Sequence, residues 1–164
     1  MTLHPSSLRR RTLLLMTAAL SLPAARAGQA APVALTVPQS LVQALELALR
    51  AQRPLVVMVS LEGCPFCRVV RDHYLGPLMC EEGQPVVQVD MGSGQPLRDF
   101  AGVLSTQDQV IRAWKVTVAP TLLFIGPGGR EVAPRLVGTS IPDFYGGYLD
   151  ERLRAARDTL KISN

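Results

Sequence analysis

The chain of 164 residues contains only three cysteines, two histidines and one tryptophan. This small, odd number of cysteines argues against a fold held together by a framework of paired disulfides. Outside Cys64 and Cys67, the remaining candidate ligands are His4, His73 and Cys80, which do not form a second ligand pair at zinc-finger spacing. The chain also lacks internal repeats and low-complexity tracts, so a repeat architecture is excluded.

The first 27 residues lack Asp and Glu, although they contain the four arginines Arg9, Arg10, Arg11 and Arg26. Without these four, the 17 Lys and Arg residues of the chain fall to 13, which balance its 13 Asp and Glu residues. The net charge of +4 therefore belongs to this leading segment. The remainder has no basic excess that would indicate a nucleic acid or an anionic membrane as partner.

The leading segment has the order of a secretory signal. Arginines at 9–11 precede an apolar run at residues 13–22, and Ala25-Arg26-Ala27 provides a cleavage site. The run is too short for a spanning helix, which needs roughly 20 residues. We therefore expect residues 1–27 to be a cleaved signal peptide and the mature protein to be soluble in the periplasm.

An uncleaved N-terminal anchor and a misassigned start are the alternatives to a cleaved signal. Arg10-Arg11 also resembles a twin-arginine signal, but Leu13 stands where that signal prefers Phe. The Sec route is therefore favoured over the twin-arginine route.

The rest of the chain alternates between helical and strand patterns. Residues 28–39 are rich in Ala and Pro and predict a tether or a leading strand. The first expected elements are a helix beginning at Ser40 and closed by Pro54, a buried strand at 55–61, a helix at 64–75 ended by Gly76-Pro77, a buried strand at 85–90 and a loop at 92–96. After them we expect a helix capped by Ser105 and Asp108, a strand at 116–126, a Gly-rich turn, a returning strand at 131–137 and a last helix that starts at 140–143. The apolar stripe expected on this last helix consists of Tyr145, Leu149, Leu153, Ala156 and Leu160. This order predicts one α/β domain over residues 40–164, with a central mixed sheet flanked by helices on both faces.

Cys64 stands where a buried strand ends and a helix begins, and Cys67 follows three residues later. Free N–H groups and the helix dipole at such a place stabilise a thiolate, which is the nucleophile in disulfide exchange. Pro65 suits the first helical turn because it has no N–H to leave unpaired. Both cysteines fall on one side of that turn and predict a redox pair, with Arg68 and Arg71 adding positive charge nearby.

Three other interpretations use the same two sulfurs: half of a zinc site, a static structural disulfide, and a copper(I) site made by two soft thiolates. The motif itself contains no Met or His that would complete a copper site. Redox exchange without a metal or an organic cofactor is therefore favoured. A copper(I) carrier remains the rival from another functional class.

The motif Gly63-Cys64-Pro65-Phe66-Cys67 is followed about 50 residues later by Val118-Ala119-Pro120-Thr121, which opens an apolar strand. Together these motifs resemble the thioredoxin superfamily, over about residues 40–160. The resemblance implies a thioredoxin-like fold with a cis bond before Pro120, which packs against the sulfurs. It further implies that Cys64 forms the mixed disulfide, that Cys67 resolves it, and that Pro65, Phe66, Ala119 and Pro120 form the substrate-binding surface.

Departures from the family pattern narrow the expected function. Met58 stands where thioredoxins place a buried acid, so no carboxylate there can take the proton of Cys67. Pro65-Phe66 resembles glutaredoxins and periplasmic disulfide isomerases, but residues 28–39 are too few for the dimerisation domain of an isomerase. Phe66 offers the Cys64 sulfur no hydrogen bond, which favours a reductase over a strong oxidant.

We therefore expect a monomeric, exported thiol–disulfide oxidoreductase. Its partners would be client proteins with thiols or disulfides and a redox partner that recycles the pair. A disulfide oxidase or isomerase is the alternative. Among the other residues, Cys80 is expected to be a buried inert thiol, Trp114 a core residue, His73 and Glu62 solvated surface residues, and Phe66 partly exposed beside Cys64.

Overall fold

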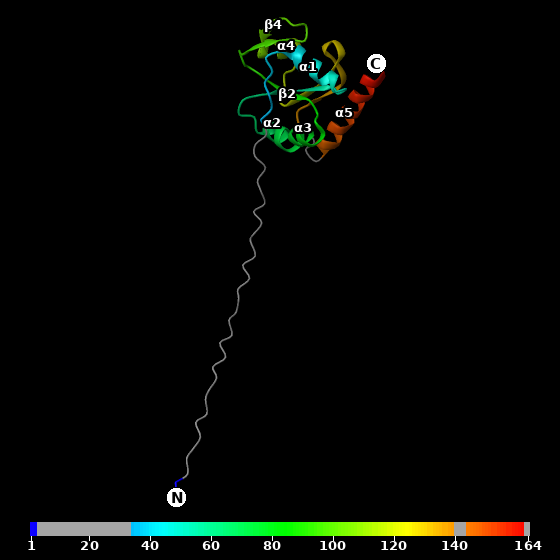
Figure 1. Cartoon of the computed structure of the whole chain (residues 1–164). Coiled ribbons are helices and arrows are strands. Elements are labelled where there is room, and N and C mark those ends of the chain that lie inside the picture. Colours follow the sequence, from blue (N-terminus) through cyan, green and yellow to red (C-terminus); the bar gives the residue numbers. More distant parts are fainter. Residues whose placement is uncertain (3–33, 140–143, 163–164) are drawn as a thin grey trace. The chain divides into compact units, whose positions relative to one another are not determined.

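The computed structural model describes residues 1–2, 34–139 and 144–162 (Figure 1). The expected signal peptide beyond Thr2, the first part of the expected tether and the expected helix start at 140–143 lie outside the described residues. The chain divides into two units, residues 1–30 and 31–164, and every element below belongs to the second.

The elements follow one another in the predicted alternation of helix and strand. They are α1 (Leu41–Arg50), β1 (Leu55–Ser60), α2 (Pro65–Val70), the π-helical η1 (Arg71–Leu75), α3 (Gly76–Glu82), β2 (Val86–Asp90), β3 (Pro96–Arg98), β4 (Leu104–Thr106), α4 (Gln107–Ala113), β5 (Thr121–Gly126), the 3₁₀ turn η2 (Pro127–Gly129), β6 (Arg130–Val137) and α5 (Tyr145–Ile162).

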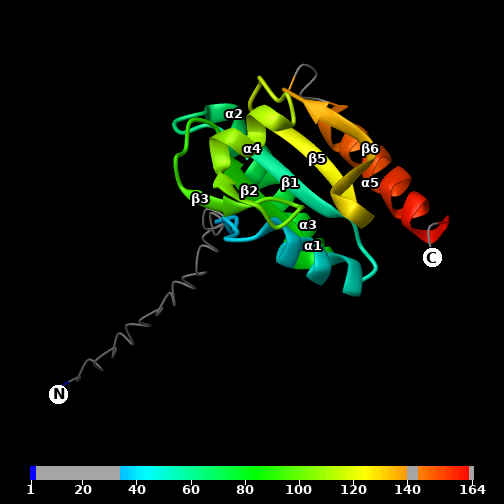
Figure 2. The same ribbon diagram turned by 90° about the horizontal axis from the view of Figure 1, so that it is seen from above.

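The main sheet has four strands in the order β2-β1-β5-β6 (Figure 2). β1 runs parallel to β2 and antiparallel to β5, and β5 and β6 form the antiparallel hairpin that the Gly-rich turn predicts. The sheet is therefore mixed, as expected. Thr36 adds a parallel bridge to Val87, so the described end of the expected tether lies along β2.

A core lies on each face of the sheet. Neighbouring side chains of a strand point to opposite faces, so each strand can contribute to both cores. Met58 and Val56 of β1 belong to one core with α5 and with the helical segment formed by α2, η1 and α3. Val57 and Val59 belong to the other core, which is closed by α1 and α4. This arrangement confirms the α/β class and the thioredoxin-like fold with helices on both faces.

The helix after the cysteine pair does not end at Gly76-Pro77, so that prediction is wrong. The chain passes through the π-helical η1 into α3 and stops only at Gly83, whose φ is 63°. A proline inside a helix lacks an N–H, and its ring crowds the carbonyl four residues earlier. The wider π-helical turn just before Pro77 gives that ring room, and the helical segment continues.

The loop expected at residues 92–96 leads into β3, which begins at Pro96 and pairs with β4 as a separate antiparallel hairpin. The following helix is capped by Thr106, whose hydroxyl accepts from the Gln109 N–H in a capping box. The predicted cap at Ser105 and Asp108 is therefore wrong by one residue.

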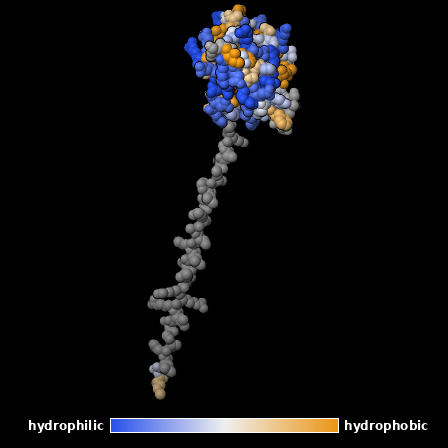
Figure 3. Space-filling model, turned by 90° about the vertical axis from the view of Figure 1, so that its right-hand side faces the viewer, coloured by the Kyte–Doolittle hydropathy of each residue, from blue (hydrophilic) through white to orange (hydrophobic). Residues whose placement is uncertain are grey.

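The apolar stripe predicted for the last helix is confirmed. Its buried members are Tyr145, Leu149, Leu153, Ala156 and Leu160. On the face of the domain shown in Figure 3, hydrophilic residues predominate and hydrophobic ones form scattered patches. In the part of the chain that the structure describes, no helix combines the length and the hydropathy of a membrane span.

Candidate redox site

A buried strand delivers the first cysteine to the surface. Every residue of β1 is buried, and the exposed residues 61–63 then lead to Cys64, the N-cap of α2. Gly63 has a φ of 71°, a left-handed conformation that strains any residue with a Cβ. The Cys64 N–H donates to the Leu61 carbonyl at 3.2 Å, which closes this turn.

Cys64 and Cys67 form a disulfide, with their Cα atoms 5.3 Å apart. Cys64 is half-buried, whereas Cys67 is only 1% exposed. The Cys67 N–H donates to the Cys64 sulfur at 3.1 Å. A hydrogen bond to the charged form of a thiol favours that form, so this N–H would stabilise a Cys64 thiolate once the disulfide is reduced.

Pro120 lies at the same end of the sheet as the cysteine pair. Val59 of β1 is paired with Thr121 of β5, so the residue before Thr121 stands beside the end of β1 from which the chain reaches Cys64. The Ala119–Pro120 bond is cis and Pro120 is buried. Ala119 and Cys64 both pack against the core that contains Cys67. The direct packing of Pro120 on the sulfurs stays a prediction.

The backbone of Ala119 is available for pairing. The Pro120 carbonyl accepts from the Gly138 N–H at 2.8 Å, whereas the N–H and C=O of Ala119 have no hydrogen-bond partner among the described residues. An extended segment of another chain could therefore pair with Ala119, as strands do at a sheet edge.

Exposed apolar side chains lie close in the chain to Cys64 and to Pro120. Phe66 is 59% exposed, Leu61 48% and Val118 43%. Each of these residues lies within three positions of Cys64 or Pro120 in the chain. An apolar rim beside the reactive sulfur suits contact with a protein client. The exposure of Phe66 is as predicted.

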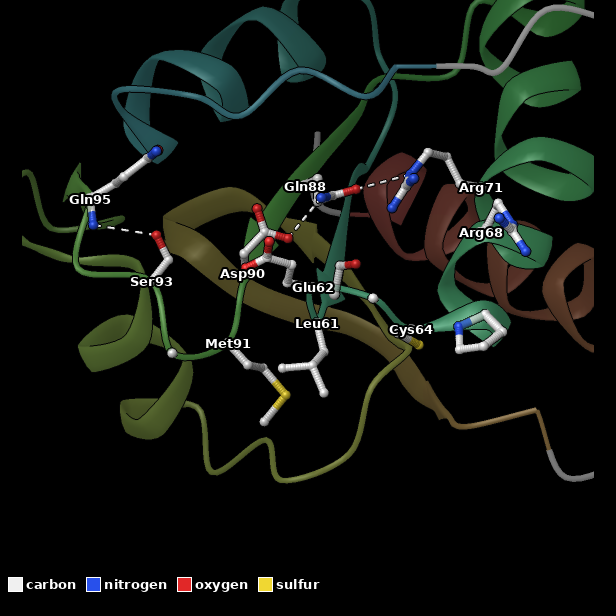
Figure 4. Close-up of a pocket in the computed structure, with 14 residues that line it drawn as sticks. Leu61, Glu62, Cys64, Arg68, Arg71, Gln88, Asp90, Met91, Ser93 and Gln95 are labelled. Carbon is white, nitrogen blue, oxygen red and sulfur yellow. Dashed lines mark hydrogen bonds between the residues drawn. The ribbon is translucent and has the colours of Figure 1, made fainter.

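A groove of about 570 Å³ adjoins Cys64 on the polar side of the site (Figure 4). Arg68 and Arg71 line it from the helical segment, and Gln88 and Asp90 line it from β2. The Arg71 Nε donates to the Gln88 Oε1 at 3.1 Å, and the Gln88 Nε2 donates to the Asp90 Oδ1 at 2.7 Å. The Arg71 guanidinium is therefore held in place at the wall of the groove.

The buried side chain of Gln107 holds two residues that line the groove, Asp90 and Gln95. Gln107 is 1% exposed, and its Oε1 accepts from the Asp90 N–H at 2.7 Å. Its Nε2 donates to the Gln95 Oε1 at 3.2 Å. Beside it, the Gly92 N–H donates to Asp108 and, together with Arg112, lowers the pKa of that carboxyl. The loop after β2 is thus tied to α4.

Sequence reasoning missed the groove, although part of its signal was present. Gln88 and Asp90 are polar residues two positions apart in an otherwise apolar strand, so they point to the same face. The contribution of Gln107, from a helix 17 residues further along the chain, has no local signal.

The structure also tests the other residues singled out from the sequence. Met58 is 0% exposed and shares a core with Cys67, so the position of the family's acid is dry and apolar. Glu62 and His73 are exposed, as expected, and Trp114 is half-buried against the second core. Cys80 is exposed, so the prediction of a buried thiol is wrong. Its physical reason is the π-helical η1, which shifts the helical phase so that Leu75 and Leu78 face the core instead.

Within the described residues, no group of three His, Cys, Asp or Glu side chains lies close enough together to hold a metal ion.

No protein-family model and no curated protein sequence matches this chain. Among solved structures, the chain is similar to thioredoxin O2 from Arabidopsis thaliana in its oxidised state, at 20% identity, 71% coverage of this chain, 93% coverage of that chain and a TM-score of 0.49. For Fasciola hepatica thioredoxin the corresponding values are 20%, 73%, 97% and 0.47. For the reduced periplasmic thioredoxin SoxS from Paracoccus pantotrophus they are 22%, 63%, 98% and 0.42.

At these identities and TM-scores the likeness is one of general architecture. The fold assignment rests on the topology of the sheet, and the chemistry rests on the cysteine pair.

Proposed function

We propose that this protein is an exported thiol–disulfide oxidoreductase that acts on other proteins, as a reductase. The observation that carries the proposal is the asymmetry of the pair. Cys64 is partly exposed, whereas Cys67 is buried and donates its N–H to the Cys64 sulfur at 3.1 Å. This arrangement gives one sulfur that a client can reach and a second that can only act on the first.

The reaction follows from that asymmetry. In the reduced protein, the Cys64 thiolate attacks one sulfur of a client disulfide, the client S–S bond breaks, and the leaving thiolate takes up a proton. The Cys67 thiol then loses its proton and attacks the Cys64 sulfur, which forms the Cys64–Cys67 disulfide and releases the second client thiol. Counted from the protein dithiol, with the ionisation of Cys64 included, the protein loses two electrons and two protons and the client gains them.

The client would dock on the rim formed by Phe66, Leu61 and Val118, and its extended backbone would pair with Ala119. Support for this comes from the exposure of the three apolar side chains and from the unpaired backbone groups of Ala119 among the described residues. Pro65 and Pro120 would shape the two sides of this docking surface.

The direction of electron flow and the compartment rest on the sequence. Phe66 offers no hydrogen bond to the Cys64 sulfur, which favours the reducing direction. Residues 1–27 have the order of a secretory signal, which favours the periplasm. N-terminal sequencing of the protein recovered from a periplasmic fraction should begin at Gly28, and a chain that retains residues 1–27 would contradict export by a cleaved signal.

Insulin turbidity in the presence of dithiothreitol tests the activity. The parent protein should accelerate precipitation, and Cys64→Ser should abolish the acceleration. With dithiothreitol removed, reduced Cys67→Ser should form a mixed disulfide with insulin. Cys80→Ser is the matched control and should behave as the parent. Turbidity that the parent does not accelerate, together with tight copper(I) uptake by the reduced pair, would favour a copper carrier instead. The potential of the pair against a glutathione buffer then fixes the direction.

A further inference from the structure

We propose that the groove beside Cys64 binds a short peptide that carries a thiol, or the disulfide of that peptide. Arg71 would be the main contact and would bind a carboxylate of the ligand. The inference rests on the proposed redox function of Cys64, and it adds a small-molecule substrate class to the protein clients.

The cationic wall carries the inference. Arg71 is half-buried, and its Nε is committed to Gln88 at 3.1 Å. Its two terminal nitrogens have no partner among the described residues. Arg68, three residues earlier, has no carboxylate within 4.0 Å in the described part of the chain. A guanidinium whose position is already fixed is suited to bidentate binding of a carboxylate.

The opposite charge lies on the facing side of the same groove. Glu62 and Asp90 both line it, and neither has an ion-pair partner in the part of the chain that the structure describes (Figure 4). The amino group of a ligand can pair with them while its carboxylate pairs with Arg71. The groove therefore complements a zwitterion.

The size and lining of the groove favour a small ligand over a protein surface. Its volume of about 570 Å³ lies in the range of small-molecule sites, about 300–1,000 Å³. Of the three apolar residues that suit a protein client, Leu61 lines the groove, whereas Phe66 and Val118 do not. Because Cys64 is one of the lining residues, the thiol of a ligand bound in the groove could approach the Cys64 sulfur.

The step is an exchange that needs no further reactant. The Cys64 thiolate attacks one sulfur of the ligand's disulfide, and one ligand thiol leaves with the proton. Cys67 then displaces the second ligand thiol from Cys64. One disulfide has become two thiols, and the protein dithiol has become its disulfide.

Rapid-quench measurement with the reduced protein tests the proposal. Glutathione disulfide provides carboxylates and amino groups, and 2-hydroxyethyl disulfide provides neither. Arg71→Gln should slow the reaction with glutathione disulfide by about tenfold, which is the value of a charge-assisted hydrogen-bonded contact. The same variant should change the reaction with 2-hydroxyethyl disulfide by less than about twofold, because this disulfide has no carboxylate for the Arg71 guanidinium to bind.

Arg154→Gln is the control, since Arg154 is an exposed arginine of α5 outside the groove. It should leave both rates unchanged. Equal slowing of both disulfides by Arg71→Gln would overturn the proposal, because Arg71 would then act on the reactivity of Cys64. An unchanged rate with glutathione disulfide, or a tenfold slowing of insulin reduction, would overturn it as well. If the parent reduces none of these disulfides, the proposed function itself fails.

Discussion

Replacement of Met58 by Asp places an acid where thioredoxins, by the resemblance described above, have one. In this protein the position is 0% exposed, in a core that contains Cys67, Val56 and Phe124. Side chains of that core are apolar, so a carboxylate at residue 58 would be desolvated. We therefore expect the substitution to destabilise the domain strongly and in a pH-dependent way.

The magnitude has two parts. Loss of a buried Met side chain costs about 2–5 kcal/mol, and an unpartnered polar group adds about 1–3 kcal/mol. Burial also raises the pKa of the new carboxyl above its unfolded value of about 3.9, by about 3 units for a fully buried group. Ionisation of this carboxyl therefore does not lower the free energy of unfolding below about pH 4, and it lowers it progressively as the pH rises to about 7. The slope is about 1.36 kcal/mol per pH unit well below the folded pKa and smaller close to it, so the loss between pH 5 and pH 7 is about 2 kcal/mol.

Guanidinium unfolding of the oxidised protein at pH 5 and pH 7 measures both parts. Met58→Asn is the matched control, because the Asn side chain has nearly the same shape and polarity as protonated Asp but does not titrate. Relative to the parent, Met58→Asn should lose the same free energy of unfolding at both pH values, and Met58→Asp should lose more at pH 7. If the two variants respond equally to pH, or if Met58→Asp loses less than about 1 kcal/mol, the site is not dry and the argument is refuted.

Three further predictions concern the groove, the last helix and the third cysteine. Gln107→Ala removes the buried side chain that holds Asp90 and Gln95, and urea unfolding should show a loss of about 2 kcal/mol. Tyr145→Phe should raise the free energy of unfolding by about 1 kcal/mol at pH 7, because the buried Tyr145 hydroxyl has no hydrogen-bond partner among the described residues. Burial also raises the pKa of Tyr145, so the parent should lose stability as the pH rises above about 10, and the variant should lose less. Cys80→Ser should change stability by less than about 0.5 kcal/mol, and a thiol reagent should label only Cys80 in the oxidised chain.

The central strands and the last helix could be predicted because their signals are local. A short, continuous apolar run rich in β-branched residues indicates a strand buried on both faces, and β1 is such a strand. The stripe of α5 repeats over its whole length. The end of the helical segment after Cys67 could not be predicted, because Leu75 and Leu78 pack into the core and override the signal of Gly76-Pro77.

The residues of the site likewise differ in whether a local sequence pattern predicts them. The Cys64–Cys67 pair is a local motif, so its disulfide could be predicted from spacing. Pro120 was assigned by resemblance, and its place beside the end of β1 depends on the pairing of β1 with β5. The alternation of Gln88 and Asp90 in β2 gives a partial local signal of the groove. The contacts of Gln88 with Arg71 and of Gln107 with Asp90 join different elements and have no local signal.

The bridge between Thr36 and Val87 has a consequence for shortened forms of the chain. β2 is an outer strand, and the Thr36 carbonyl accepts from the Gln88 N–H at 3.0 Å while Leu35 is buried beneath. Outer strands with free N–H and C=O groups recruit strands from other copies. A chain that begins at Ser40 would lack the segment that pairs with β2, and it would self-associate along that strand. A chain that keeps residues 34–39 would retain the pairing.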